Sequence, residues 1–197
     1  MFTTFSTRGG SRRRTVGLSG CALLALRSTL DAPSRTRTLA LLSGAAYTDA
    51  HTRSIVDRWA ETYAKEGADR FALRLLKDLY YPDWIEAHLD FADEVRRAAV
   101  RQDFGPARKW ALSIARFDER SRIASIDRPV LVVQGMDDQV TDASHARILR
   151  QSIVHAQMRI FPQTGHMIPL ERPHETAEAI ASFVRSAEGA TPVVGTG

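Results

Sequence analysis

Short, continuous apolar runs recur along this chain and are separated by segments with helical patterns. Three of the runs cover residues 38–44, 129–135 and 158–162, and a further short run ends at residues 16–18. Continuous runs of Leu, Val and Ile that are bounded by turn residues are typical of strands buried on both faces of a parallel sheet. We therefore predict about four parallel strands.

The segments between and after these runs predict helices at residues 20–28, 144–152 and 173–187. Asp142 or Ser144 is expected to cap the second of these helices, and Pro173 suits the first turn of the third. Strands that alternate with helices in this way indicate an α/β layered domain.

The middle of the chain differs, because residues 50–120 are helical and polar in pattern. Large apolar side chains recur there at roughly helical spacing, at Trp59, Tyr63, Phe71, Leu75, Leu79, Trp84 and Phe91. We expect most of them to form the packed face of a helical insertion, with some lining a pocket. Four acidic residues of this region are expected to form a solvated helix face: Asp83, Glu86, Asp90 and Glu94.

The composition is that of a soluble globular domain of 197 residues, with 44% hydrophobic and 25% charged residues. Its single cysteine, Cys21, excludes an internal disulfide, and no Cys/His cluster has the spacing of a zinc site. We expect no metal and no cofactor. No apolar run reaches the roughly 20 residues that span a bilayer, so we expect a cytoplasmic protein without a membrane partner.

The charge is concentrated near the N-terminus. Residues 1–37 contain seven arginines and one aspartate and so carry +6, while the whole chain carries +4. No motif of a nucleic-acid-binding fold accompanies these arginines, so we expect no nucleic-acid partner. Residues 1–14 are expected to form a flexible basic arm, and residues 187–197 a disordered tail.

The first apolar segment, GLSGCALLAL at residues 17–26, directly follows part of this basic stretch. A basic stretch followed by apolar residues also opens an export signal. However, the residues after Leu26 supply no small-residue cleavage site, and too few residues separate Arg14 from Cys21 for a lipoprotein signal. An export or lipoprotein signal is therefore the less favoured interpretation of this segment.

The same segment contains the sequence Gly17-Leu18-Ser19-Gly20-Cys21. It matches the G-x-S-x-G pattern except for the cysteine in the last place. In that pattern the serine lies on a sharp turn between a strand and a helix, which projects its Oγ. Two alternatives are that Ser19 is a helix N-cap and that Cys21 is the nucleophile, although no histidine follows Cys21 in a fitting context.

Two further polar residues follow predicted strands: Asp138 comes shortly after one strand and His166 shortly after the next. The carboxyl ends of parallel strands share one edge of a sheet, so we expect Ser19, Asp138 and His166 to meet there. The residues that compete for these positions are Asp137, Asp142, His51, His88, His145, His155 and His174. Apart from His174, on the first turn of the last helix, these histidines are expected at the surface.

Three segments together resemble the α/β-hydrolase family. Residues 15–44 resemble the family's nucleophile elbow with the following helix and strand. Residues 126–138 resemble its strand that leads to the acid, and residues 164–173 resemble its histidine loop. The order Ser, Asp, His along the chain is also that of the family. The chain resembles the C-terminal two-thirds of the fold, and the strands that precede the elbow in the family are expected to be missing. Its general sequence pattern is similar to that of small carboxylesterases and lactone hydrolases such as the 3-oxoadipate enol-lactonases.

The resemblance implies a partial α/β-hydrolase fold with a core at residues 15–49 and 118–186 and a helical cap at residues 50–117. It also implies roles for four residues. Ser19 would be the nucleophile, His166 the general base and Asp138 the acid that orients it, while the Gly20 N–H would donate to the oxyanion. The implied reaction is hydrolysis of a small ester or lactone through an acyl-enzyme.

A second interpretation remains open, in which the chain is a truncated or pseudoenzyme domain that binds without turnover. Without the preceding strands, the strand that ends at residues 16–18 would form an open sheet edge, which favours pairing with another chain. The expected partners are therefore a small-molecule ester or lactone and, through that edge, a second copy of the chain.

Overall fold

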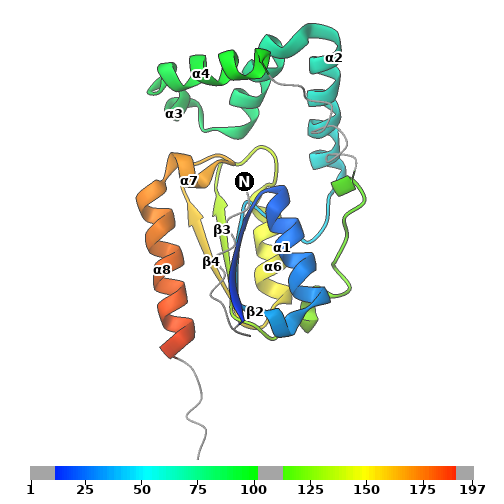
Figure 1. The fold of residues 1–197 in the computed structure, drawn as a ribbon, viewed down its shortest axis with the longest axis vertical. Coiled ribbons are helices and arrows are strands. Elements are labelled where there is room, and N and C mark those ends of the chain that lie inside the picture. Colours follow the sequence, from blue (N-terminus) through cyan, green and yellow to red (C-terminus); the bar gives the residue numbers. More distant parts are fainter. Residues whose placement is uncertain (1–11, 102–112, 190–197) are drawn as a thin grey trace, which may run out of the picture.

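The computed structural model describes residues 12–101 and 113–189, where a parallel sheet is flanked by helices (Figure 1). The four strands pair in the order β1-β2-β3-β4, so β1 lies at an edge of the sheet. Their bounds are β1 Arg13–Leu18, β2 Thr36–Leu42, β3 Val130–Gly135 and β4 Ala156–Phe161. All three pairings are parallel, which confirms the predicted α/β class and strand number.

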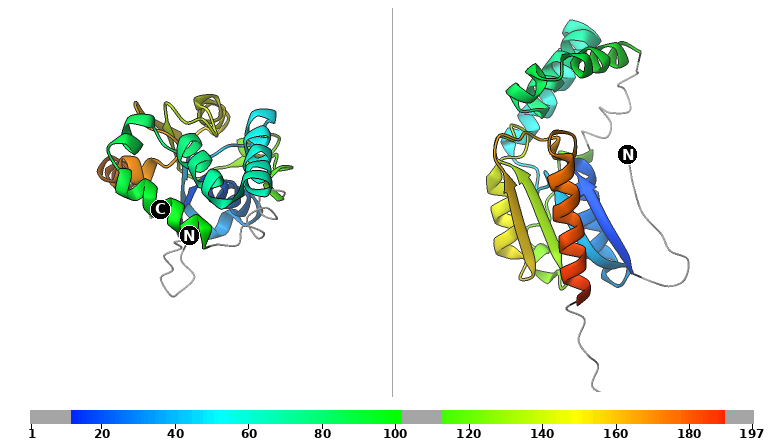
Figure 2. Two further views of the ribbon diagram at one scale, coloured as in Figure 1. Left: turned by 90° about the horizontal axis from the view of Figure 1, so that it is seen from above. Right: turned by 90° about the vertical axis from the view of Figure 1, so that its left-hand side faces the viewer.

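Helices cover both faces of this sheet. The core helices are α1 Gly20–Asp31, α6 Ala143–Ser152, α7 Ile168–Glu171 and α8 Pro173–Gly189, and the short 3-10 helices are η1 Pro33–Arg35 and η2 Ile123–Ser125. Successive residues of a strand point to opposite faces, so Leu39 and Leu41 of β2 pack in the cluster that includes α1 and α6. Ala40 and Leu42 pack in the cluster that includes α7 and α8. In the right-hand view of Figure 2, α8 (red) lies in front of the sheet.

The apolar segment at residues 17–26 is part of this core. Ala22 is 1% exposed and Leu26 is fully buried, and both belong to the larger hydrophobic cluster. Burying these side chains stabilises the fold through the hydrophobic effect. Their place in the core favours a structural role for the segment over a targeting role.

Three helices stand over the carboxyl ends of the strands and together form the cap: α2 Ala50–Leu79, α3 Pro82–Glu86 and α4 Leu89–Val100 (Figure 1). α2 is bent at Gly67, whose φ of 84° interrupts the helix. The Tyr80 ring stacks on Trp84 at 5.1 Å and meets Phe91 edge-on at 5.5 Å. These rings pack on one another, as expected for the cap's own packed face. Part of the predicted cap, residues 102–112, lies outside the described residues.

The predicted arm and the predicted tail are both shorter than the sequence-based expectation. β1 begins at Arg13, which pairs with Thr36 of β2, so the strand includes the last residues of the predicted arm. α8 continues to Gly189, so the first residues of the predicted tail at 187–197 are helical. Residues 1–11 and 190–197 lie outside the described residues.

The crossing of α1 over β1 is so close at Gly17 that no side chain fits there. A Cβ at this position would lie 2.5 Å from the carbonyl oxygen of Cys21 and 2.7 Å from the Cα of Ala22. Both are backbone atoms of α1, so the helix itself would have to move. Glycine at this position therefore permits the tight strand-to-helix turn.

We expect Gly17→Ala to lower the free energy of unfolding by about 1–3 kcal/mol, because the added methyl group overpacks the β1–α1 contact. Chemical denaturation measures this change. Gly189→Ala is the matched control, since a Cβ there would meet nothing within 4 Å. Equal stability of the two variants would contradict the close packing at Gly17.

Candidate active site

Ser19 occupies the sharp turn between β1 and α1. Its backbone has φ 56° and ψ −129°, a conformation that L-residues with a side chain rarely adopt. The turn is held by the Ser19 N–H, which donates to the carbonyl oxygen of Leu42 at 2.9 Å. Ser19 stands at the N-cap position of α1, but its side chain makes no capping hydrogen bond to the helix, so the hydroxyl does not act as a cap.

The Ser19 hydroxyl contacts the imidazole of His166, which lies on the loop between β4 and α7. The Nε2 atom of His166 is 2.7 Å from the Oγ of Ser19. The His166 side chain is 1% exposed, and its Nδ1 lies 2.8 Å and 2.9 Å from the two carboxylate oxygens of Asp138. A carboxylate only accepts, so Nδ1 carries the proton and Nε2 accepts from the serine hydroxyl.

Asp138 is held in place by several donors besides His166. Its Oδ1 accepts from the N–H groups of Val140 at 2.8 Å and Thr141 at 3.0 Å. Burial alone would raise the pKa of Asp138, but the neighbouring His166 and these hydrogen bonds outweigh it and lower the pKa. Asp138 is therefore ionised at neutral pH and can stabilise an imidazolium.

The acids that competed with Asp138 in the sequence have other contacts. Asp142 caps α6, since its Oδ1 accepts from the Ser144 N–H at 2.6 Å. The Asp137 backbone N–H donates to the carbonyl oxygen of Thr164 at 3.0 Å. The structure thus places Asp138, as expected, beside His166.

His145 differs from expectation, because it is buried and not at the surface. Its side chain is 1% exposed, and its Nε2 lies 3.2 Å from the Oδ2 of Asp49, which caps α2. The Tyr47 ring lies against it, with the ring centroids 5.1 Å apart. The prediction failed because the loop before α2 covers this face of α6. The other competing histidines, His51, His88, His155 and His174, are exposed.

Sequence reasoning missed three residues that surround this group. Gln134 donates from Nε2 to the Oδ2 of Asp138 at 2.8 Å, and the Thr141 hydroxyl donates to the same atom at 3.0 Å. The Ser43 hydroxyl donates to the His166 carbonyl oxygen at 2.7 Å. A glutamine inside the apolar run of β3 was the available signal, because a buried amide needs partners.

Gly20 directly follows Ser19 and is the first residue of α1. The N–H groups of a helix's first turn have no partners within the helix and attract negative charge. The Gly20 N–H therefore belongs to a turn that is suited to an anionic oxygen near Ser19.

The described residues contain no group of three or more His, Cys, Asp or Glu side chains that could hold a metal ion. Within the same parts of the chain, no helix combines the length and the hydropathy needed to cross a membrane.

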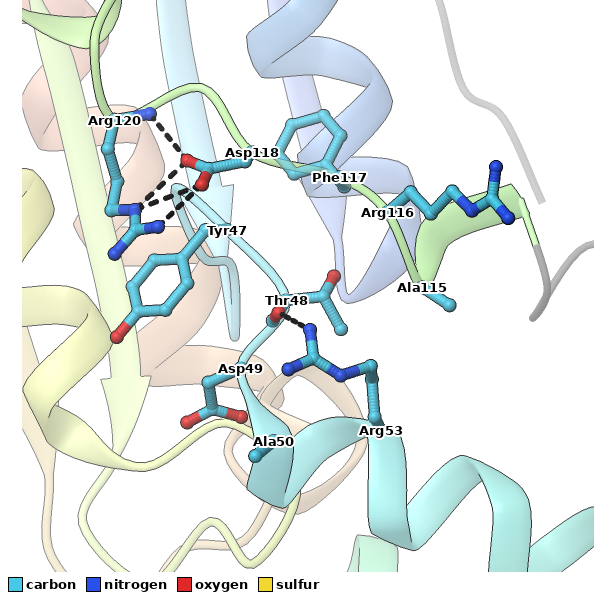
Figure 3. A pocket seen from close by; sticks show the side chains of 10 residues that line it. All are labelled: Tyr47, Thr48, Asp49, Ala50, Arg53, Ala115, Arg116, Phe117, Asp118 and Arg120. Atoms are coloured by element: carbon cyan, nitrogen blue, oxygen red, sulfur yellow. Dashed lines mark hydrogen bonds and ion pairs between the residues drawn. The ribbon is translucent and has the colours of Figure 1, made fainter.

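A cleft of about 300 Å³ lies beside the two connections between the cap and the core (Figure 3). It is lined by Tyr47, Thr48, Asp49, Ala50, Arg53, Ala115, Arg116, Phe117, Asp118 and Arg120. The Arg120 guanidinium pairs with Asp118 at 2.6 Å and lies over the Tyr47 ring at 4.1 Å, and Arg53 donates to the Thr48 carbonyl oxygen. Much of the polar lining is thus satisfied internally, and the cleft contains none of the three hydrogen-bonded residues described above.

The chain is similar to known hydrolases in sequence. It is 33% identical over 72 residues to the monoacylglycerol lipase ABHD6 of Rattus norvegicus, which covers 36% of this chain and 21% of that protein. It is 24% identical over 184 residues to the 2-hydroxymuconate semialdehyde hydrolase of Pseudomonas sp. (strain CF600), covering 89% of this chain and 62% of that protein. The chain thus spans less than two-thirds of the length of these relatives.

The fold is similar to that of solved structures. The enol-lactonase from Burkholderia xenovorans LB400 superposes with a TM-score of 0.80 at 22% identity, over 89% of this chain and 66% of that chain. The family of the alpha/beta hydrolase fold matches residues 15–173, which is most of the chain. With its parallel sheet, its cap and a strained serine on the strand-to-helix turn, the chain belongs to the α/β hydrolase fold family.

Proposed function

We propose that this chain carries the nucleophile, base and acid of a serine hydrolase that acts on small carboxylic esters or lactones. The observation that carries the proposal is the continuous hydrogen-bonded chain from the Ser19 hydroxyl through the His166 imidazole to the Asp138 carboxylate. Of these three hydrogen-bonded residues, Ser19 is half-buried, while His166 and Asp138 are buried.

In the first half of the reaction, the Oγ of Ser19 attacks the carbonyl carbon of the substrate while its proton passes to the Nε2 of His166. Asp138 holds the imidazole in the required tautomer and stabilises the imidazolium. The Gly20 N–H donates to the oxygen that becomes negative. The tetrahedral intermediate then collapses, and the leaving alkoxide takes the proton from Nε2.

In the second half, a water molecule attacks the acyl-serine ester and gives its proton to Nε2. Collapse of this second intermediate releases the carboxylic acid, and the Ser19 oxygen recovers its proton from His166. For a lactone, the leaving alkoxide stays tethered to the acyl group, so both halves yield one hydroxy acid. No cofactor takes part in these steps.

The bond type is supported by two of the similar proteins. One of them is named a monoacylglycerol lipase and another an enol-lactonase. Both names refer to carboxylic ester or lactone bonds. The same triad also serves other acyl substrates on this fold, so the ester and lactone assignment is the part of the proposal that substrate screening tests.

We expect Ser19→Ala to abolish labelling by a fluorophosphonate probe, because the probe phosphonylates only an activated serine. The intact mass after incubation measures the adduct. Ser144→Ala, which removes an exposed hydroxyl on α6, is the control and should keep a single adduct. A folded wild-type chain that gains no mass would instead support the non-catalytic interpretation.

We expect Asp138→Asn to lower kcat by about 10⁴-fold, because an amide at this position favours the wrong tautomer of His166. Hydrolysis of a chromogenic short-chain ester measures the effect. Asp137→Asn changes the neighbouring acid, whose side chain is not among the hydrogen-bond partners of His166 within the described residues, and should retain the wild-type rate. Similar rates in both variants would contradict the role of Asp138.

A further inference from the structure

The loop that carries His166 is held against the end of the cap. The backbone N–H groups of His166 and Met167 both donate to the carbonyl oxygen of Leu79, at 2.8 Å and 3.1 Å. Gly165 lies so close to the same segment that a Cβ there would be 2.8 Å from the nitrogen of Tyr81. The C-terminal end of α2 and the histidine loop therefore contact each other backbone to backbone.

One buried carboxyl group joins the two sides of this contact. Glu171 is the last residue of α7 and is 7% exposed. Its Oε2 accepts from the N–H of Gly165 at 2.9 Å, on the histidine loop, and from the N–H of Tyr81 at 3.0 Å, just beyond α2. A buried N–H without a partner is costly, so this single oxygen stabilises both segments in their present places.

The surroundings of Glu171 do not favour its charge. Burial raises the pKa of Glu171, and the Asp138 charge adds to this effect, while the backbone N–H groups oppose it. Its Oε1 is buried and has no hydrogen-bond partner among the described residues. An apolar side chain of similar size would avoid these costs, but it would leave the amides of Gly165 and Tyr81 unpaired. The contribution of Glu171 therefore lies in its two backbone contacts.

We propose that Glu171 is a positioning residue for His166: its carboxyl group clamps the loop at residues 165–167 to the end of α2 and so keeps the imidazole in line with Ser19. The inference rests on the proposed function, since it takes His166 as the base. It also couples the cap to the chemistry, because a displacement of the end of α2 is transmitted to His166 through the Leu79 carbonyl and Glu171.

The first test compares Glu171→Met with Glu171→Gln. Met removes the acceptor, and we expect the rate constant for fluorophosphonate labelling to fall by about 10- to 100-fold. Gln keeps an acceptor oxygen and is expected to recover most of that loss. Glu175→Gln, an exposed acid on α8, is the control and should label at the wild-type rate.

A second readout separates positioning from general stability. The proton between the Nδ1 of His166 and Asp138 gives a low-field NMR resonance in a correctly placed pair. We expect this resonance to shift or broaden in Glu171→Met at a temperature where the variant is fully folded, and to return in Glu171→Gln. A residue that only stabilises the fold would leave the resonance unchanged.

A variant on the cap side tests the same clamp if Glu171→Met does not fold. Tyr81 has φ −66° and ψ 135°, and Tyr80 before it has φ −121° and ψ 153°, so the backbone suits a proline at position 81. Tyr81→Pro removes the N–H that reaches Glu171, and Tyr81→Ala removes the side chain alone. We expect Tyr81→Pro to label about 5- to 10-fold more slowly than Tyr81→Ala.

Wild-type labelling and an unchanged resonance in folded Glu171→Met would overturn the proposal, as would equal labelling of the two Tyr81 variants. If the wild-type chain does not react with the probe, the proposed function fails by itself. In that case the Nδ1 resonance and the hydrogen exchange of the His166 and Met167 amides decide the positioning role. Faster exchange in Glu171→Met or Tyr81→Pro supports it, and unchanged exchange overturns it.

Discussion

The site depends on four parallel strands that run in register to a common edge. One row of paired residues crosses the whole sheet: Leu18, Leu42, Val133 and Arg159. Because the strands end close to this row, the loops that follow them open on the same side. Ser19 and His166, which are 147 positions apart in the chain, meet there without either loop being long. Parallel pairing also requires crossover connections, which supply the helices that cover both faces of the sheet.

The parts of this arrangement that depend on local sequence could be predicted, and those that depend on distant partners could not. Apolar runs mark β2 and β3 because these two strands are buried on both faces, and Ser19 and His166 follow β1 and β4 at short distance. The burial of His145 depends on Asp49, which is 96 positions away, and that of Glu171 on Tyr81, which is 90 positions away. Nothing in the pattern around either residue signals such a partner.

Two carboxyl groups lie near the same histidine loop, and their surroundings act in opposite directions. Burial would raise the pKa of Asp138, but the neighbouring His166 and the hydrogen bonds from Thr141 and Val140 lower it. Burial raises the pKa of Glu171, because fewer donors oppose this effect and the Asp138 charge adds to it. The contrast follows from the number of donors around each group. An ionised Asp138 is suited to stabilise a charge on His166, whereas Glu171 is suited to hold the backbone of its neighbours in place.

Ser19 holds a backbone conformation that glycine would adopt with ease. A residue with a Cβ at φ 56° and ψ −129° costs about 1–3 kcal/mol, which the surrounding fold must supply. Replacing Ser19 by glycine would relieve this cost and remove the hydroxyl in the same step. Stability and reactivity therefore oppose each other at one position. Under the proposed function, Ser19→Gly would therefore give a more stable chain that lacks its nucleophile, so stability alone does not favour a serine at this turn.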